Sequence, residues 1–215
     1  MTAKVILVTN QKGGCGKTTL SMNLAGIIGS KFKVLLIDGD PQGSASRWAA
    51  SSSDDKPFPT AVMSLANVTD KVNREIKKYL ADYEYIIVDC PPAIDNSFTA
   101  SALLVADLAL VPVVPSPTDL WAAIGIQKLI SNVSEINEKL TARLVANMCQ
   151  SNASISKEAL SLIDEFEFPK TNTDIYQRTA YRQAAAFGGT VLDLDNPKAK
   201  SEINALVAEV LDLVA

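Results

Sequence analysis

The sequence contains no histidine, and this absence excludes several kinds of chemistry. Without an imidazole the chain has no side chain whose ordinary pKa lies near neutrality, so histidine-based acid–base catalysis is excluded. A serine–histidine–aspartate triad and metal sites built on imidazole ligands are excluded as well. Any chemistry in this chain must therefore use side chains other than imidazole.

Cysteine is also scarce, with three residues that lie far apart at Cys15, Cys90 and Cys149. Their spacing fits neither a disulfide framework nor a zinc site, and this pattern is typical of a reducing compartment. No apolar run reaches the roughly 20 residues of a membrane span, and no secretory leader pattern precedes the first apolar run. We therefore expect a soluble, cytoplasmic protein that makes no contact with a membrane.

Positive charge is in slight deficit, with 20 basic and 24 acidic residues and a net charge of −4. This balance disfavours an overall basic nucleic-acid binder, although it leaves room for a local basic patch. The length of 215 residues and the 47% apolar content suit one globular domain, predicted over residues 1–215.

Short apolar runs alternate with longer helical patterns along the chain. Runs such as 35–37, 86–88 and 144–146 are continuously apolar, as is typical of strands buried on both faces of a parallel sheet. The sequence therefore predicts an α/β fold with a doubly wound, mostly parallel sheet and helices on both faces. The predicted strands are 5–9, 34–38, 85–89, 108–114 and 144–148, and the predicted helices are 17–30, 68–80, 97–106, 118–139, 156–166 and a last helix from 197.

The last helix is amphipathic and has a clear start at Asn196 and Pro197. Its apolar stripe recurs at helical spacing from Ile203 to Val214, while its other face carries acidic residues. Helices that lie on membranes normally carry lysine and arginine on the polar face, so we expect this helix to pack on the sheet.

The strongest motif is a glycine-rich loop that follows the first strand and opens a helix. It consists of Lys12, Gly13, Gly14, Cys15, Gly16, Lys17, Thr18 and Thr19. Glycines let backbone N–H groups surround an anion, and the start of a helix adds its positive dipole end. In such a loop Lys17 reaches the β- and γ-phosphates and the Thr18 hydroxyl is a ligand for Mg²⁺. Position 11 is glutamine where the ordinary phosphate loop has glycine, so the match is to a deviant form.

Acidic residues follow two of the predicted strands. Asp38 and Asp40 come at the end of the second strand, and Asp89 ends the apolar run 86–88. The carboxyl ends of strands in a doubly wound sheet face the ligand crevice, so these carboxylates are predicted to support Mg²⁺ and an attacking water.

Taken together, these parts resemble the ParA-type partition ATPases of the MinD/ParA deviant Walker A group, in particular the small type similar to ParF. The resemblance covers nearly the whole chain, and the motifs that carry it are residues 10–19, 38–43, 89–92, 111–117, 175–188 and 196–200. Larger members have an N-terminal operator-binding extension, and we expect this chain to lack it.

The resemblance implies a cytoplasmic ATPase that binds ATP with Mg²⁺ and dimerises. Lys12 matches the signature lysine, which reaches the phosphates of the partner subunit, and Asp40 matches the acid that activates water. Asp38 and Asp89 match the residues that support the metal with Thr18. Asn147 and Tyr176 lie where relatives hold adenine, although Asn147 also suits a capping or turn role.

The family further implies nonspecific DNA binding by the ATP dimer, association with the nucleoid, and a centromere-binding or cargo adaptor protein of ParB/ParG type that stimulates hydrolysis. Arg178 and Arg182 are the candidate DNA contacts, although a pair of arginines four apart also suits a solvated helix face. The cargo is left open among a plasmid, a chromosome region and a protein organelle.

Three alternatives on the same fold stay open. A MinD-like membrane-positioning ATPase is disfavoured by the acidic last helix. A nitrogenase-like iron protein needs free cluster cysteines, whereas Cys15 and Cys90 lie inside the phosphate motifs. A small-molecule ligase is disfavoured by Lys12 and by the run of residues 40–42.

Overall fold

The computed structural model describes residues 2–92, 97–150 and 166–215, and the structural statements below concern these parts of the chain. They form a six-stranded sheet in which every strand pair is parallel, with the order β3-β2-β4-β1-β5-β6. The strands are β1 (Lys4–Val8), β2 (Val34–Asp38), β3 (Ala61–Ser64), β4 (Tyr85–Asp89), β5 (Leu108–Val113) and β6 (Thr141–Ala146). The helices are α1 (Lys17–Gly29), α2 (Ser44–Ala50), α3 (Val72–Lys77), α4 (Ser97–Leu103), α5 (Pro117–Ser134), α7 (Thr179–Phe187), the 3-10 turn η1 (Val191–Asp193) and α8 (Pro197–Leu213).

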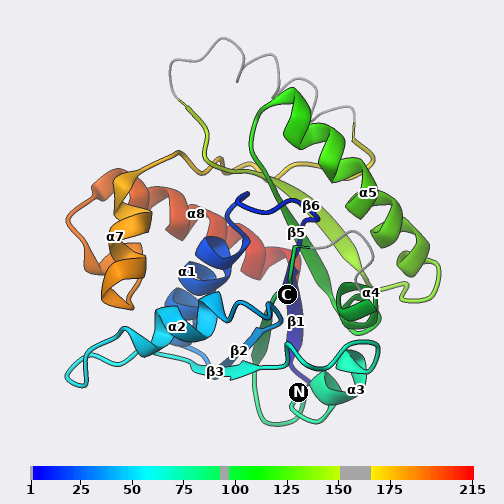
Figure 1. The fold of residues 1–215 in the computed structure, drawn as a ribbon, viewed down its shortest axis with the longest axis horizontal. Coiled ribbons are helices and arrows are strands. Elements are labelled where there is room, and N and C mark those ends of the chain that lie inside the picture. The colour runs from blue at the N-terminus through cyan, green and yellow to red at the C-terminus, as the bar shows by residue number, and fades with distance from the viewer. Residues whose placement is uncertain (1, 93–96, 151–165) are drawn as a thin grey trace.

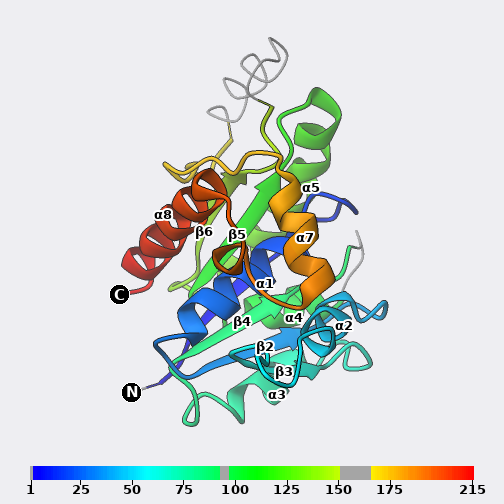
Figure 2. The same ribbon diagram turned by 90° about the vertical axis from the view of Figure 1, so that its left-hand side faces the viewer.

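Helices cover both faces of the sheet (Figure 1). On one face α3, α4 and α5 pack against strand residues that include Leu7 and Val88. On the other, α1, α2, α7 and α8 pack against a set that includes Ile6 and Ile87, and Figure 2 looks onto this side. Successive strand residues point to opposite faces, so each buried strand serves both cores and must be apolar throughout. The predicted doubly wound α/β fold is confirmed, and the described sheet is wholly parallel.

The last helix, α8, packs on the sheet through its apolar stripe, as the sequence predicts. Ile203, Leu206 and Val210 of α8 are fully buried in the core beside α1. Two acids on the other face are engaged within the chain: Glu209 accepts the backbone N–H groups of Asn172 and Thr173, and Glu202 accepts from Arg178.

The sequence patterns missed three short elements. The helix α2 has buried side chains only at Ala45 and Trp48, which is too few to reveal a helical period. The edge strand β3 has a half-exposed pattern rather than an apolar run. The helix α7 was not recognised either, although it carries the candidate Arg182.

Several element ends also differ from the expectations. The helix expected at 68–80 is limited to α3, and α5 ends at Ser134 rather than at 139. The sixth strand, β6, covers residues 141–146 instead of 144–148. The neighbouring strand β5 begins at Leu108, and Leu108 is paired with Thr141, so the pairing starts at Thr141. The helix expected at 156–166 lies outside the described residues except for its last position.

The fold brings the carboxyl ends of β1, β2 and β4 together. In the sheet, β2, β3 and β4 lie on one side of β1, whereas β5 and β6 lie on the other side of β1. The direction in which strands are added to the sheet therefore reverses at β1. In open α/β sheets the ligand crevice lies at such a reversal, outside the carboxyl ends of the strands. Asp38 and Asp89 occupy the same register position on adjacent strands at this edge. None of the helices in the described ranges is long and apolar enough to cross a bilayer.

Candidate functional site

The glycine-rich loop between β1 and α1 lies at this edge. Gly14 and Gly16 have φ angles of 78° and 91°, in the left-handed region that glycine adopts without strain. Gly16 precedes the first residue of α1 and provides no side-chain cap, so the first N–H groups of the helix are left to a ligand. A Cβ at Gly16 would lie 2.2 Å from Nδ2 of Asn147, so only glycine fits there. Free N–H groups at a helix start are a site for an anion such as a phosphate.

Lys17 is buried at the base of the loop. Its Nζ donates to the backbone carbonyl oxygen of Lys12 over 2.8 Å, so the ammonium is held inside the loop. Among the described residues, no acidic side chain forms an ion pair with it. Its other contact is a weak hydrogen bond to Sγ of Cys15. A buried cation that has only neutral partners is suited to a phosphate group, which supplies negative charge.

Thr18 and Asp89 form the second part of the site. The hydroxyl of Thr18 donates to Oδ2 of Asp89 over 2.7 Å, and Ser21 donates to Oδ1 over 3.1 Å. Burial raises the pKa of Asp89 to about 7, although these hydrogen bonds favour the ionised carboxylate. A hydroxyl beside a buried carboxylate, next to a loop that can bind phosphates, is a donor set that Mg²⁺ favours. These residues therefore fit the predicted cation.

The two aspartates after β2 have different surroundings. Asp38 is fully buried, and its Oδ2 accepts both the backbone N–H and the hydroxyl of Ser46 over 2.8 Å. Asp40 is half-buried at the crevice, where its Oδ1 accepts the backbone N–H of Gln42 over 2.8 Å. Its own N–H donates to Asp38 over 3.2 Å. Asp38 is thus a fixed part of the interior, whereas Asp40 is partly exposed and only its Oδ1 accepts a hydrogen bond from the described residues.

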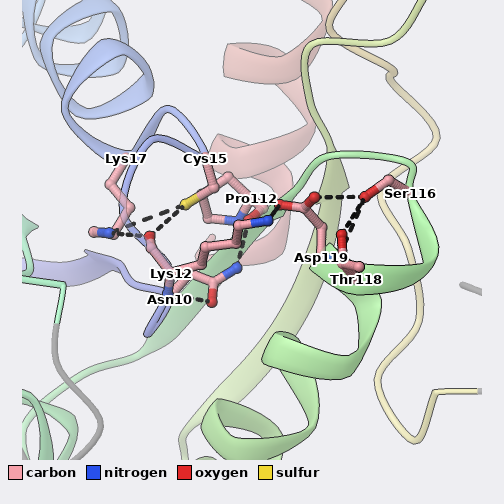
Figure 3. A network of polar contacts seen from close by, with 8 residues as sticks. All are labelled: Asn10, Lys12, Cys15, Lys17, Pro112, Ser116, Thr118 and Asp119. Atoms are coloured by element: carbon pink, nitrogen blue, oxygen red, sulfur yellow. Dashed lines mark hydrogen bonds and ion pairs between the residues drawn. The ribbon is translucent and has the colours of Figure 1, made fainter.

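Lys12 points away from the loop (Figure 3). Its Nζ pairs with Oδ1 of Asp119 over 2.7 Å, in the first turn of α5. The hydroxyl of Ser116 caps this helix and also donates to Asp119. The base of the loop is tied to β5, because Asn10 donates to the carbonyl oxygen of Pro112 over 2.8 Å. In Figure 3 the side chains of Lys12 and Lys17 leave the loop in different directions, and only Lys12 reaches α5.

The predicted adenine residues lie together beside the loop. Asn147 and Tyr176 line a cavity of about 160 Å³ with Thr19 and with both candidate arginines. Asn147 also has a structural role, because its Nδ2 donates to the carbonyl oxygen of Cys15 over 2.7 Å. Its part in adenine binding stays a prediction.

The two candidate DNA contacts differ in availability. The guanidinium of Arg178 bonds to both carboxylate oxygens of Glu202 through Nε and Nη2, and it lies over the ring of Tyr176. Arg182 is exposed on α7 and forms no ion pair with the described residues. Arg178 is therefore a weaker candidate for a DNA phosphate than Arg182.

Sequence reasoning missed four residues of this site. Ser21 and Ser46 bind the aspartates, Asp119 binds Lys12, and Tyr181 lines the cavity with a buried hydroxyl that has no partner among the described residues. The position of Asp119 in a capped first turn was readable from the sequence. Its pairing with Lys12 was not, because the two residues are distant in the chain.

The geometry thus defines the phosphate loop of an α/β nucleotide-binding fold with a second lysine, Lys12, beside the usual one. Comparison with known families agrees: residues 6–191 match the CobQ/CobB/MinD/ParA nucleotide binding domain, and the chain belongs to this family.

The chain is similar in sequence to two proteins over nearly their full length, and it shares its fold with a solved structure. The maintenance of carboxysome distribution protein A of Halothiobacillus neapolitanus is 33% identical over 97% of both chains. The sporulation initiation inhibitor protein Soj of Bacillus subtilis is 25% identical, covering 92% of this chain and 93% of Soj. A solved ATP complex of a Cyanothece McdA variant has a TM-score of 0.81 at 18% identity, covering 97% of this chain and 96% of the other.

Proposed function

We propose that this protein is a Mg²⁺-dependent ATPase that dimerises when it binds ATP and distributes a cargo over nonspecific DNA, with slow hydrolysis that a partner protein stimulates. The observation that carries the proposal is the pair of lysines in one loop. Lys17 is buried and forms no ion pair with the described residues, as suits a group that binds the chain's own nucleotide. Lys12 is directed outward, with 37% of its side chain exposed, as a group that acts on a second copy requires.

The residues present suggest how the reaction is supported. The loop N–H groups and Lys17 would hold the β- and γ-phosphates, and Thr18 and Asp89 would hold Mg²⁺, which would supply positive charge beside the phosphates. Asp40 orients or deprotonates the attacking water from the crevice side. Asp38 keeps the turn that carries Asp40 in place through its bonds to Ser46 and to the Asp40 N–H.

In the described part of the free monomer, the second lysine of the loop is engaged within its own chain. Lys12 is paired with Asp119 in this state, and hydrolysis of phosphates depends on charge stabilisation by such a group. Slow turnover by the isolated chain, and acceleration when a second copy or a partner completes the site, follow from this arrangement.

The cargo proposal rests on the relatives. A protein named for carboxysome distribution is 33% identical across nearly its full length, whereas relatives named for chromosome partitioning are 28% and 25% identical. We therefore favour a large protein assembly, recognised through an adaptor protein, over a plasmid or a chromosome region. DNA then serves as the surface on which the ATP dimer is held, and Arg182 and the lysines of α8 are its candidate contacts.

The test is ATP turnover by purified protein with Mg²⁺, alone and with duplex DNA, anionic vesicles or a pool of small carboxylic acids. We expect slow turnover that DNA and the adaptor encoded beside the gene accelerate. Stimulation by vesicles alone would favour a membrane-positioning ATPase, and turnover coupled to a metabolite would favour a ligase.

Asp40→Ala sharpens this test. General acid–base catalysis contributes about 100-fold or more to rates, so the variant should hydrolyse ATP at least about 100-fold more slowly while it binds ATP normally. Asp54→Ala, which removes an exposed carboxylate from the loop after α2, is the matched control and should leave turnover unchanged. Normal turnover in Asp40→Ala would remove Asp40 from the mechanism.

A further inference from the structure

A second cavity, with a volume of about 540 Å³, lies away from the phosphate loop. Its walls are the second half of α1, the end of α7 and the loops 51–59 and 188–193, on the side of the sheet that Figure 2 shows. Gly26 of α1 lines it, nine residues after Lys17, which corresponds to about 14 Å along the helix axis. The volume is within the range of roughly 300–1,000 Å³ that is usual for binding pockets. The cavity is therefore separate from the nucleotide crevice and large enough to receive a ligand.

Close backbone packing holds the walls of this cavity in place. Gly188 has a φ angle of 68°, and a Cβ there would lie 2.1 Å from the backbone nitrogen of Ser52, so only glycine lets the end of α7 meet that loop. A Cβ at Gly26 would lie 2.4 Å from Cγ2 of Thr190, so the loop that carries Thr190 rests directly on α1. The cavity thus exists in the free chain, and an occupant does not have to open it.

The cavity is lined mainly by apolar residues and bordered by acidic ones. Phe187, a large aromatic residue at the end of α7, lines it and is 66% exposed. The three segments that form the cavity, 26–31, 51–59 and 186–195, together carry four aspartates and two lysines. The two charged side chains that line the cavity, Lys56 and Asp193, are already paired over 2.6 Å. The border therefore has an excess of negative charge around an uncovered aromatic side chain.

This composition selects the occupant of the cavity. Duplex DNA and anionic membranes carry the same sign of charge as the border and are repelled by it. A small metabolite needs convergent polar groups that orient it, whereas the charged groups of the lining are engaged with each other. A positively charged protein segment with an apolar side chain complements both the acidic border and the aromatic lining.

One wall of the cavity is bonded to the helix that begins at the phosphate loop. Asn23 of α1 is fully buried, and its Oδ1 accepts the backbone N–H of Val191 over 2.9 Å. Its Nδ2 donates to the carbonyl oxygen of Thr19 over 2.8 Å. Thr19 is the last residue of the phosphate-loop motif, so a single amide connects the wall of the cavity to the nucleotide site.

The same wall is bonded to α2. The indole Nε1 of Trp48 donates to the carbonyl oxygen of Gly189 over 2.9 Å. Two residues earlier on this helix, Ser46 donates to Asp38, which in turn holds the backbone N–H of Asp40. A molecule that binds against the loop 188–193 therefore contacts a wall that is joined to both acidic residues after β2.

We infer that this cavity is the docking site of the adaptor protein and that it receives a positively charged segment of the adaptor, with an apolar side chain seated beside Phe187. The inference rests on the proposed stimulation by a partner protein and adds the surface on which that partner acts. Docking here stimulates turnover without entry into the nucleotide crevice, because the wall of the cavity is bonded to α1 and to α2.

The probes are the purified adaptor encoded beside the gene and fluorescein-labelled peptides of 20 residues that together cover its sequence. Anisotropy measures the binding of each peptide, and ATP turnover measures the response to the whole adaptor. We expect the wild-type protein to bind a peptide of net positive charge, with an affinity that falls as salt is added. Tightest binding of a neutral or acidic peptide would overturn the inference, because the acidic border would then have no role.

Phe187→Ser and Ile136→Ser are the matched variants for the apolar contact. Both residues are exposed, at 66% and 75%, and Ile136 lies just beyond the end of α5 on the other face of the sheet. Phe187→Ser should weaken peptide binding and raise the adaptor concentration for half-maximal stimulation by at least about tenfold, because a large apolar contact is lost. Ile136→Ser should change neither. ATP affinity and melting temperature, measured without the adaptor, show whether each variant is folded.

A second pair of variants tests the charge of the border. Asp55→Lys reverses an exposed charge in the loop beside the cavity, and Asp70→Lys makes the same reversal before α3, on the opposite face of the sheet. Asp55→Lys should weaken binding of the basic peptide by about threefold or more at low salt, and Asp70→Lys should weaken it less. Equal effects of the two reversals would exclude the acidic border as the reason for binding and overturn the choice of occupant.

The outcomes separate this inference from the proposed function. Normal stimulation of both Phe187→Ser and Ile136→Ser would overturn the docking site and leave the partner-stimulated ATPase standing. An adaptor that neither binds the wild-type protein nor stimulates it would overturn both. If Phe187→Ser lost binding to duplex DNA or to anionic vesicles while it responded normally to the adaptor, the cavity would belong to another occupant and the inference would be wrong.

Discussion

The bottom and the edge of the crevice have opposite surroundings. At the bottom, Lys17, Asp38 and Asp89 are buried, and hydroxyl groups or backbone atoms of the same chain bind them. At the edge, Lys12 and Asp40 are only partly covered, and Trp121 and Ile124 are exposed beside them. Groups that are desolvated and held in place suit a ligand that one chain binds alone. Groups left at the surface suit a contact with a second molecule.

The comparison predicts that substitutions at the bottom and at the edge of the crevice impair different steps of the reaction cycle. Changes at the bottom should weaken nucleotide binding strongly, and every later step with it. Changes at the edge should leave binding intact and affect association or turnover. An edge variant that loses nucleotide binding, or a bottom variant that keeps it, would show that the crevice does not separate nucleotide binding from association and turnover.

The largest effect is expected from Lys17→Gln. Hydrogen bonds to charged groups contribute about 1.5–3 kcal/mol, so loss of the ammonium should weaken ATP binding by about 10- to 100-fold or more. Isothermal titration calorimetry measures this directly. The melting temperature without nucleotide should not fall, because glutamine removes a buried charge that has no acidic partner among the described residues. ATP affinity close to that of the wild type would contradict the assignment of the loop.

A selective effect is expected from Lys12→Ala. ATP binding by the monomer should stay within about threefold, because this residue holds Lys17 through its backbone carbonyl, which alanine retains. The dimer formed with ATP should weaken by at least about tenfold, as expected when a charge-assisted hydrogen bond to phosphate is removed. Light scattering across a concentration series measures the dimer. Lys56→Ala, which breaks an exposed ion pair with Asp193 on another surface, is the control and should change neither property. An unchanged dimer in Lys12→Ala would exclude action on the second copy.

The smallest effect concerns the arginines beside the cavity. Arg182→Ala should reduce the slope of log affinity for duplex DNA against log salt by about 0.9 for each phosphate that the arginine neutralises in the wild-type complex. Arg178→Ala should change that slope less and instead lower stability by about 1–3 kcal/mol, because it leaves the carboxylate of Glu202 without its cationic partner. Anisotropy of labelled DNA and thermal melting separate the two effects. Normal DNA binding by Arg182→Ala at all salt concentrations would transfer the contact to Lys198 and Lys200 of α8.

Much of the bottom of the crevice could be predicted from the sequence. The loop residues 12–19 and the acids after two apolar strands were identified by local pattern, and the parallel sheet brings Asp38 and Asp89 to the same position at one edge. The supporting hydroxyls of Ser21 and Ser46 were not predicted. Serine is common in helices and turns, and nothing local indicates that its hydroxyl faces a carboxylate.

The edge was less predictable. The resemblance to partition ATPases assigned a role to Lys12, but no local signal indicated where its side chain lies in the free chain. The pairing of Arg178 with Glu202 was equally hidden, because it joins α8 to the residue that precedes α7. The helix α2 was missed because it buries too few residues to produce a period, whereas α7 buries Ala180, Tyr181 and Ala184 at helical spacing and could have been recognised.

The sequence by itself determined the fold class and the phosphate loop, because continuous apolar runs and glycines in a loop before a helix are local requirements of buried parallel strands and of anion binding. Only the tertiary structure decided which charges are paired and which apolar residues are left uncovered. Asp119 meets Lys12, and Trp121 is exposed while Leu120 beside it is buried, because the rotation of α5 against the sheet places them so. That rotation depends on the packing of many distant side chains, and no short stretch of sequence encodes it.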